Sequence, residues 1–170
     1  MTHDIFIQGL GILATLFVVL SFTQKDDIRF KILIMIGAGI FTIHFLLLGA
    51  YAGAIVALLN TTRTGLSMTR FKGNYILSIF MMLYVVMAFI VYETWIDILP
   101  FFAGAGATFA MFKFSGLKLR YAFFCTEMSW FAYSIIVQSI GGVITNSVVL
   151  SMNTVTTYRL LKDKRHEPNT

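Results

Sequence analysis

The feature that most constrains this chain is its division into long apolar runs separated by short charged clusters. One run, from Ile32 to Met68, would extend more than about 50 Å as a single helix, at about 1.5 Å per residue. A helix needs only about 20 apolar residues to cross about 30 Å of hydrocarbon. The run therefore has to break, and Gly49-Ala50-Tyr51 offers a turn. Such a pattern is typical of a protein that crosses a membrane several times.

The composition excludes an ordinary water-soluble domain. Hydrophobic residues make up 58% of the chain and charged residues 12%, whereas soluble domains have about 45–50% and about 25%. Too little polar surface is left to cover a soluble globule, but lipid tolerates such a chain. The amino terminus, Met1 to Asp4, lacks the basic region and cleavage site of a secretory signal, so we expect the first apolar run to be retained as a helix.

The apolar runs predict seven transmembrane helices, and hence an all-α polytopic membrane bundle. The stretch from Tyr121 to Leu161 is again too long for one span, and we expect Ser139-Ile140-Gly141-Gly142 to divide it into the sixth and seventh helices. The first five predicted helices are Ile5–Thr23, Ile32–Leu48, Tyr51–Met68, Tyr75–Tyr92 and Leu99–Phe112.

Basic residues collect in alternate turns of this predicted bundle, and the other turns have no Lys or Arg. The positive-inside rule places the basic turns in the cytoplasm, and an odd number of spans then places the amino terminus outside. The net charge of +5 is thereby a topology signal, and nucleic-acid binding is not expected. The basic residues after the first, third and fifth helices and in the tail are Lys25, Arg29, Lys31, Arg70, Lys72, Lys113, Lys118, Arg120, Lys162, Lys164 and Arg165.

Three short matches in the same order indicate an internal repeat around the fourth predicted helix. They predict two three-helix units, 1–73 and 95–162, joined by a linker helix at 74–94 and followed by a cytoplasmic tail at 163–170. The linker restores the direction of the chain, so the units are parallel, and in transporters with repeats the site lies between them near the midplane. The matches pair Gly9-Leu10-Gly11 with Gly104-Ala105-Gly106, Arg29-Phe30 with Arg120-Tyr121, and Asn60 with Asn153.

Several turns and helix ends carry a resemblance to a known family. They are Gln24-Lys-Asp-Asp-Ile-Arg-Phe-Lys31, His44-Phe-Leu-Leu-Leu-Gly49, Leu59-Asn-Thr-Thr-Arg-Thr64, Leu99-Pro100, Gly116-Leu-Lys-Leu-Arg120, Ser139-Ile-Gly-Gly142 and Leu150-Ser-Met-Asn153 with Arg159. In these the chain resembles the YgjV family of bacterial inner membrane proteins over nearly its whole length. The resemblance implies a location in the inner membrane, because that family is described by location and not by a reaction.

The three-one-three layout is also similar, more distantly, to the SWEET sugar carriers and the wider PQ-loop superfamily. In SWEET carriers an Asn on the third helix of each repeat and an aromatic residue on the second helix line the substrate pocket. The resemblance implies that Asn60, Asn153 and Trp130 line a pocket, although the predicted second helix has no Trp to match Trp130. The Pro-Gln signature is absent, because neither Pro100 nor Pro168 precedes Gln, and a proline hinge is therefore not implied.

Polar side chains inside the apolar runs are the candidate solute-binding residues. The amides of Asn60 and Asn153 both donate and accept hydrogen bonds, so they either bind a hydroxylated or amide-bearing solute or join helices to one another. Trp130 either stacks on a solute ring or packs inside the bundle. His44, near the external end of the second predicted helix, either binds solute, senses pH or forms a hydrogen bond to a neighbouring helix.

Two charged residues lie deeper in the apolar runs than the rest. A charge at the bilayer centre costs at least about 2.5–3.5 kcal/mol unless it is paired or hydrated. An ion pair between Arg63 and Glu127 would remove that cost, with Arg159 as a rival partner for Glu127. Alternatively, Glu127 takes up a proton during transport, and Arg63 extends toward the cytoplasmic face.

Neither a metal or cofactor nor an enzymatic activity is expected. The histidines, His3, His44 and His166, are too scattered to form a ligand set, and no Ser/His/Asp spacing suggests catalysis. The single cysteine, Cys125, follows two phenylalanines in an apolar run and is interpreted as a packed core residue.

The sequence thus favours a transporter or facilitator for a small polar solute, with its site between the two units. The alternative is a non-transporting membrane receptor or assembly module. The predicted partners are the lipid bilayer and an unidentified small polar solute, and whether the chain forms a homo-oligomer stays open.

Overall fold

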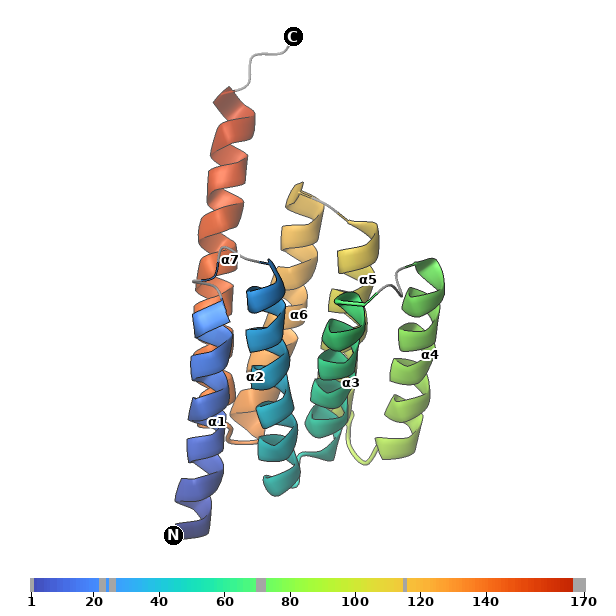
Figure 1. Ribbon diagram of the computed structural model, residues 1–170, viewed down its shortest axis with the longest axis vertical. Helices are drawn as coiled ribbons and strands as arrows, with labels where there is room; N and C mark the ends of the chain where they lie inside the picture. The colour runs from blue at the N-terminus through green and yellow to red at the C-terminus, as the bar shows by residue number, and fades with distance from the viewer. Residues whose placement is uncertain (1, 22–23, 25–26, 70–72, 115, 167–170) are drawn as a thin grey trace.

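The computed structural model describes residues 2–21, 24, 27–69, 73–114 and 116–166. The positions named above that lie outside this set are Met1, Thr23, Lys25, Arg70, Lys72 and Pro168. Within these ranges the fold has seven α-helices, one 3₁₀ turn and no strand, which confirms the predicted all-α class (Figure 1). The elements are α1 (Thr2–Ser21), α2 (Asp27–Leu47), α3 (Tyr51–Ser67), α4 (Asn74–Val91), η1 (Trp95–Asp97), α5 (Ile98–Lys113), α6 (Gly116–Ile136) and α7 (Ile140–His166).

Helix ends differ from the prediction where the sequence becomes charged. Helix α2 begins at Asp27 and not at Ile32, α6 begins at Gly116 and not at Tyr121, and α7 continues to His166, into the predicted tail. A helix need not end where its apolar run ends, because the long stems of Lys and Arg follow the helix surface while their charged groups reach a polar layer.

Three segments of the described chain are both long and apolar enough to cross a membrane: Asp4–Ser21, Asn74–Val91 and Trp95–Lys113. A shorter apolar helix covers Lys31–Leu47. Large apolar side chains also cover much of the surface, and Phe89 on α4 is 82% exposed. Extensive apolar surface of this kind is unusual on a soluble monomer and suits contact with lipid.

Both long runs break as predicted, and the two breaks share one hydrogen-bond geometry. The second break lies at residues 137–139, so only Ser139 of the four residues predicted for it is outside α7. Gly49 after α2 has φ 72°, and the amide of Ala50 donates to the Phe45 carbonyl at 2.9 Å. Gln138 after α6 has φ 56°, and the amide of Ser139 donates to the Ser134 carbonyl at 2.9 Å. A left-handed residue followed by such a bond is a common helix C-terminal cap. The chain therefore turns in the same way before α3 and before α7.

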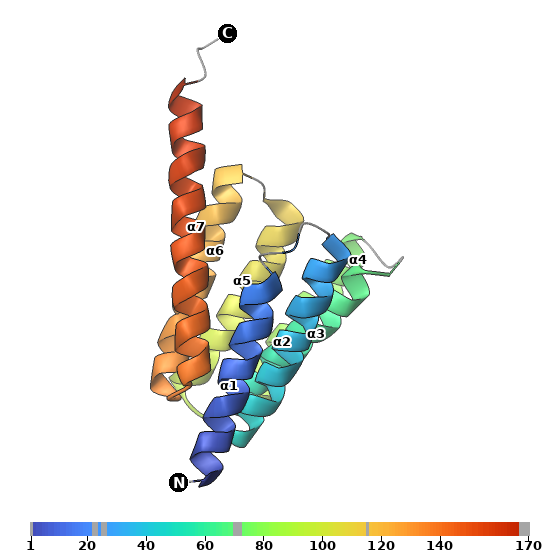
Figure 2. The ribbon, with the colours of Figure 1, turned by 60° about the vertical axis from the view of Figure 1, so that its left-hand side comes forward.

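Six helices form a closed ring, and the remaining helix, α4, packs on the outside of this ring. Contacts run from α1 to α2, α3, α5, α6, α7 and back to α1, while α4 packs on α3 and α5. The helices form two rows, α1–α2–α3 and α5–α6–α7, which lie close together near the amino terminus of α7 and diverge toward its carboxyl end (Figure 2). A Cβ atom on Gly141 would collide with the carbonyl group of Gly11, so α1 and α7 meet there at backbone distance.

Candidate functional site

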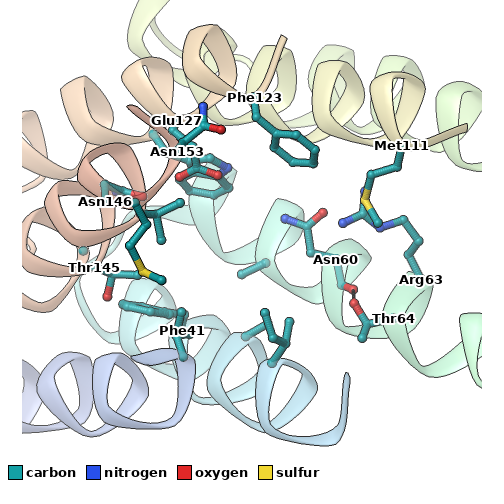
Figure 3. A pocket seen from close by; sticks show the side chains of 18 of the residues that line it. Phe41, Asn60, Arg63, Thr64, Met111, Phe123, Glu127, Thr145, Asn146 and Asn153 are labelled. Carbon is teal, nitrogen blue, oxygen red and sulfur yellow. Dashed lines mark hydrogen bonds between the residues drawn. The ribbon is translucent and has the colours of Figure 1, made fainter. Parts of the chain in front are cut away.

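A cavity of about 950 Å³ lies between the two rows, and residues from all seven helices line it (Figure 3). Ligand pockets commonly have about 300–1,000 Å³. The lining extends from Lys31 and Arg120, near the basic helix ends, to Phe45 and Trp130, deeper in the bundle. The cavity therefore occupies the half of the bundle nearer to the basic ends.

Aromatic rings separate the cavity from the opposite end of the bundle. The rings of Phe45 on α2 and Trp130 on α6 stack with centroids 5.9 Å apart, and Phe41 and Tyr133 pack against them at 5.7 Å and 6.0 Å respectively. Trp130 packs inside the bundle, which is one of the two roles considered for it, and its side chain also lines the cavity.

His44 lies beyond this aromatic layer and not on the cavity wall. Its side chain is fully buried, with Nδ1 2.8 Å from the Ile7 carbonyl oxygen and Nε2 2.7 Å from the Ser139 hydroxyl. Because a carbonyl oxygen only accepts, Nδ1 donates, and in the neutral imidazole Nε2 then accepts from Ser139. The structure places His44 in a hydrogen-bonded position between α1, α2 and the α6–α7 turn, away from the predicted solute contact.

Tyr133 makes the corresponding contact from α6. Its hydroxyl accepts a hydrogen bond from the Gly53 amide at 2.9 Å, an amide in the first turn of α3 that has no partner within the helix. Just before α7, the Ser139 hydroxyl accepts a hydrogen bond from the Gly142 amide at 3.0 Å and also contacts His44. We call the layer formed by His44, Tyr133, Ser139 and the Gly11–Gly141 crossing the closed end.

The wall of the cavity formed by α3 offers hydrogen-bond donors. Asn60 Oδ1 accepts from the Tyr84 hydroxyl at 2.9 Å, and Arg63 Nη1 donates to the Thr108 hydroxyl. Arg63 is therefore held against α5 within the bundle. The Asn60 amide nitrogen and the other guanidinium N–H groups have no partner in the part of the chain that the structure describes. We call Asn60 and Arg63 the donor wall.

The wall formed by α6 and α7 offers acceptors. Asn153 Nδ2 donates to the Arg120 carbonyl oxygen at 2.9 Å, while its Oδ1 is buried and unpartnered among the described residues. Asn146 Nδ2 donates to the Ser134 hydroxyl at 3.1 Å. Within the same described ranges, the Glu127 carboxylate has neither an ion pair nor a hydrogen bond. We call Glu127 and Asn153 the acceptor wall.

The predicted ion pair between Arg63 and Glu127 is not formed. The two side chains lie on opposite sides of the cavity (Figure 3), because α3 belongs to one row and α6 to the other, and Arg63 reaches Thr108 on its neighbour α5 instead. Arg159, the predicted rival, is exposed on α7 and does not line the cavity. Of the three charged residues predicted for the site, Arg63 and Glu127 line the cavity and Arg159 does not.

Asn60 and Asn153 do line one cavity, but they present different groups to it. Among the described residues, only the oxygen of the Asn60 amide has a hydrogen-bond partner, and only the nitrogen of the Asn153 amide has one. The interpretation of Cys125 as a core residue is wrong: it is exposed on α6, because it shares with Phe124 and Met128 the face that points away from the bundle.

Several lining residues were not predicted, notably Phe41, Phe123, Thr145 and Asn146. Asn146 could have been found, because it is an amide in an apolar helix like the two that were chosen. Phe41 and Phe123 could not, since in a membrane helix an inward-facing Phe has the same surroundings in sequence as a lipid-facing one.

Comparison with known proteins decides the family. The model of the family described as bacterial inner membrane protein (Imp-YgjV) matches residues 5–164. The chain belongs to this family. It is 28% identical over 146 residues to the inner membrane protein YgjV of Escherichia coli (strain K12), covering 86% of this chain and 79% of that protein. No solved structure matches the chain. The predicted resemblance is thereby confirmed, and it identifies the chain as an inner membrane protein.

Proposed function

We propose that this chain is a non-enzymatic transporter or facilitator for a small polar solute, with its site between two three-helix units. The observation that carries the proposal is the cavity between the two rows, whose walls have hydrogen-bonding groups without partners in the described part of the chain. Buried polar groups are normally paired, so unpaired groups that face a cavity suggest a missing solute. A bundle built only as an assembly module has no need of such groups.

The helix contacts support the proposed repeat, with units at 1–73 and 95–162 and α4 as the linker. In this repeat α1, α2 and α3 correspond to α5, α6 and α7. The contact between α1 and α7 then corresponds to the contact between α5 and α3, and both contacts are present. His44, Ala50 and Gly53 also follow one another at the same spacing as Tyr133, Ser139 and Gly142. In each set, a buried side chain of a second helix reaches the start of the other unit's third helix.

We further propose that the basic helix ends face the cytoplasm and that the closed end faces outside. All seven helices span the bilayer in this arrangement, and the cavity is reached from the cytoplasmic side. Transport then requires the closed end to open, which means separating His44 from Ser139 and Tyr133 from Gly53. Those hydrogen bonds join the two units, so relative rocking of the units would break them together.

Solute uptake into proteoliposomes tests this proposal. The purified protein is reconstituted and assayed with a panel of radiolabelled sugars, amino acids and amines. Asn60→Ala and Asn153→Ala are expected to reduce uptake of the transported solute. Thr62→Ala and Thr154→Ala are matched controls, because these neighbouring threonines are exposed and bond only within their own helix.

The proposal fails if no solute on the panel enters the vesicles, or if both Asn variants transport like the controls. Binding of a solute without uptake would favour the receptor alternative.

A further inference from the structure

The two walls of the cavity differ in the chemistry they offer, and this difference points to a solute class. The donor wall has a cation, Arg63, and the free Asn60 amide nitrogen. The acceptor wall has an anion, Glu127, and the buried free oxygen of Asn153. A guanidinium prefers carboxylate or phosphate oxygens, and a carboxylate prefers charged N–H donors.

Hydrogen bonds between α6 and α7 place the parts of the acceptor wall at neighbouring levels. The bonds join Arg120 to Asn153 and Ser134 to Asn146. Asn146 and Asn153 are seven residues apart in α7, and Glu127 lies midway between their two partners in α6. Its Cα atom is therefore about one helical turn, or about 5 Å along the axis, from the level of each Asn Cα atom. An ammonium group at this level has acceptors from both helices.

On the donor wall, Asn60 and Arg63 are three residues apart and therefore lie on the same face of α3. The cavity between the two walls is lined largely by apolar side chains, including Phe41, Phe123 and Val149. The α3 and α6 helices belong to different rows of the ring, so the solute has to be long enough to reach from one wall to the other.

From this juxtaposition we infer that the cavity binds an elongated zwitterion. Its ammonium group lies at Glu127 and Asn153, its anionic group lies at Arg63 and Asn60, and an apolar body lies between them. The inference rests on the proposed function, because it takes this cavity to be the solute site. ω-Amino acids, short peptides and zwitterionic lipid headgroups share this chemistry.

Other solute classes satisfy the walls less well. A simple amine leaves Arg63 unpaired, and a simple anion leaves Glu127 unpaired; an unpaired charge at low dielectric is costly. A sugar carries no charge for either wall, and its hydroxyl groups would meet the apolar lining between them. A zwitterion pairs both charges and brings no net charge into the cavity.

Fluorescence of Trp130 provides a direct binding assay. Of the two tryptophans, Trp95 is exposed on η1, so Trp95→Phe leaves the cavity residue Trp130 as the only tryptophan. The zwitterionic probes are glycine, 4-aminobutyrate, 6-aminohexanoate and 8-aminooctanoate. Hexylamine, hexanoate and glucose are the controls that lack one or both charges, and glycerophosphoethanolamine represents a lipid headgroup.

We expect an intermediate ω-amino acid to bind about tenfold more tightly than glycine, hexylamine or hexanoate, because only it engages both walls. In the Glu127→Gln variant, the ω-amino acid should no longer bind more tightly than hexanoate. In the Arg63→Gln variant, it should no longer bind more tightly than hexylamine. Such opposite changes in preference cannot come from partial misfolding, which would weaken all probes alike. Tighter binding of glycerophosphoethanolamine would assign the zwitterion to a lipid headgroup and would support the same chemistry.

The inference is overturned if hexylamine or hexanoate binds as tightly as every zwitterion, if only glucose binds, or if no zwitterion binds. It is also overturned if both variants weaken all probes equally. Failure of the proposed function gives a different result: the zwitterion binds to purified protein but does not enter proteoliposomes. If only an uncharged solute is transported, the proposed function is supported and the inference of a zwitterionic solute is overturned.

Discussion

The closed end and the cavity both contain polar side chains but use them in opposite ways. At the closed end, His44, Tyr133 and Ser139 are all hydrogen-bonded to partners on other elements. In the cavity, Glu127 and the Asn153 oxygen have no partner among the described residues. An unsatisfied buried polar group costs about 1–3 kcal/mol. The comparison indicates that the closed end stabilises the bundle, while the cavity keeps unsatisfied groups that a solute can pair.

The largest expected effect comes from the backbone crossing at the closed end. In Gly141→Ala the new methyl group collides with the Gly11 carbonyl, so α1 and α7 must separate. We expect the free energy of unfolding to fall by about 3 kcal/mol, at the upper end for overpacking. Denaturation in detergent followed by circular dichroism measures it. Gly9→Ala is the matched control, since a methyl group there meets no atom within 4 Å; equal stability of the two variants would contradict the crossing.

A smaller loss is expected when one hydrogen bond of the closed end is removed. Tyr133→Phe leaves the Gly53 amide without its acceptor, which should lower the free energy of unfolding by about 1–2 kcal/mol. Tyr92→Phe, at an exposed position, serves as the reference in the same denaturation experiment. A Tyr133→Phe protein as stable as this reference would show that the hydroxyl is not needed for closure.

In the cavity, removing a charged group should not lower the free energy of unfolding, in contrast to the substitutions at the closed end. Glu127→Gln removes a charge that has no partner in the described structure, so the free energy of unfolding should stay unchanged or rise by about 1 kcal/mol. Met128→Gln, one position along α6 on the exposed face, controls for the substitution itself. A loss of more than about 1 kcal/mol specific to Glu127→Gln would mean that the carboxylate stabilises the empty protein.

The smallest effect belongs to the outer surface. Cys125→Ser lies on the exposed face of α6, and its stability should stay within about 0.5 kcal/mol of the parent. A larger loss, measured in the same denaturation assay, would place Cys125 in a packed environment after all.

The sequence sufficed for features that depend on chain direction and hydrophobicity. The seven helices and both interhelical breaks follow from run length and turn residues, and the polar positions Asn60, Asn153 and Trp130 all line the cavity. Pairing between side chains could not be predicted, because it depends on the order of helices around the ring. Arg63 was assigned to Glu127 on charge alone, yet the ring places Thr108 beside it.

We propose that the cavity is reached from the basic side of the bundle, that this side faces the cytoplasm, and that the other end is sealed. Cysteine accessibility tests it most directly in a Cys125→Ser background, with Val149→Cys in the cavity wall and Glu93→Cys in the turn before η1. An impermeant maleimide should label Val149→Cys in inverted membrane vesicles and not in intact cells. It should label Glu93→Cys in intact cells and not in inverted vesicles. Labelling of Val149→Cys in intact cells but not in inverted vesicles would contradict this account.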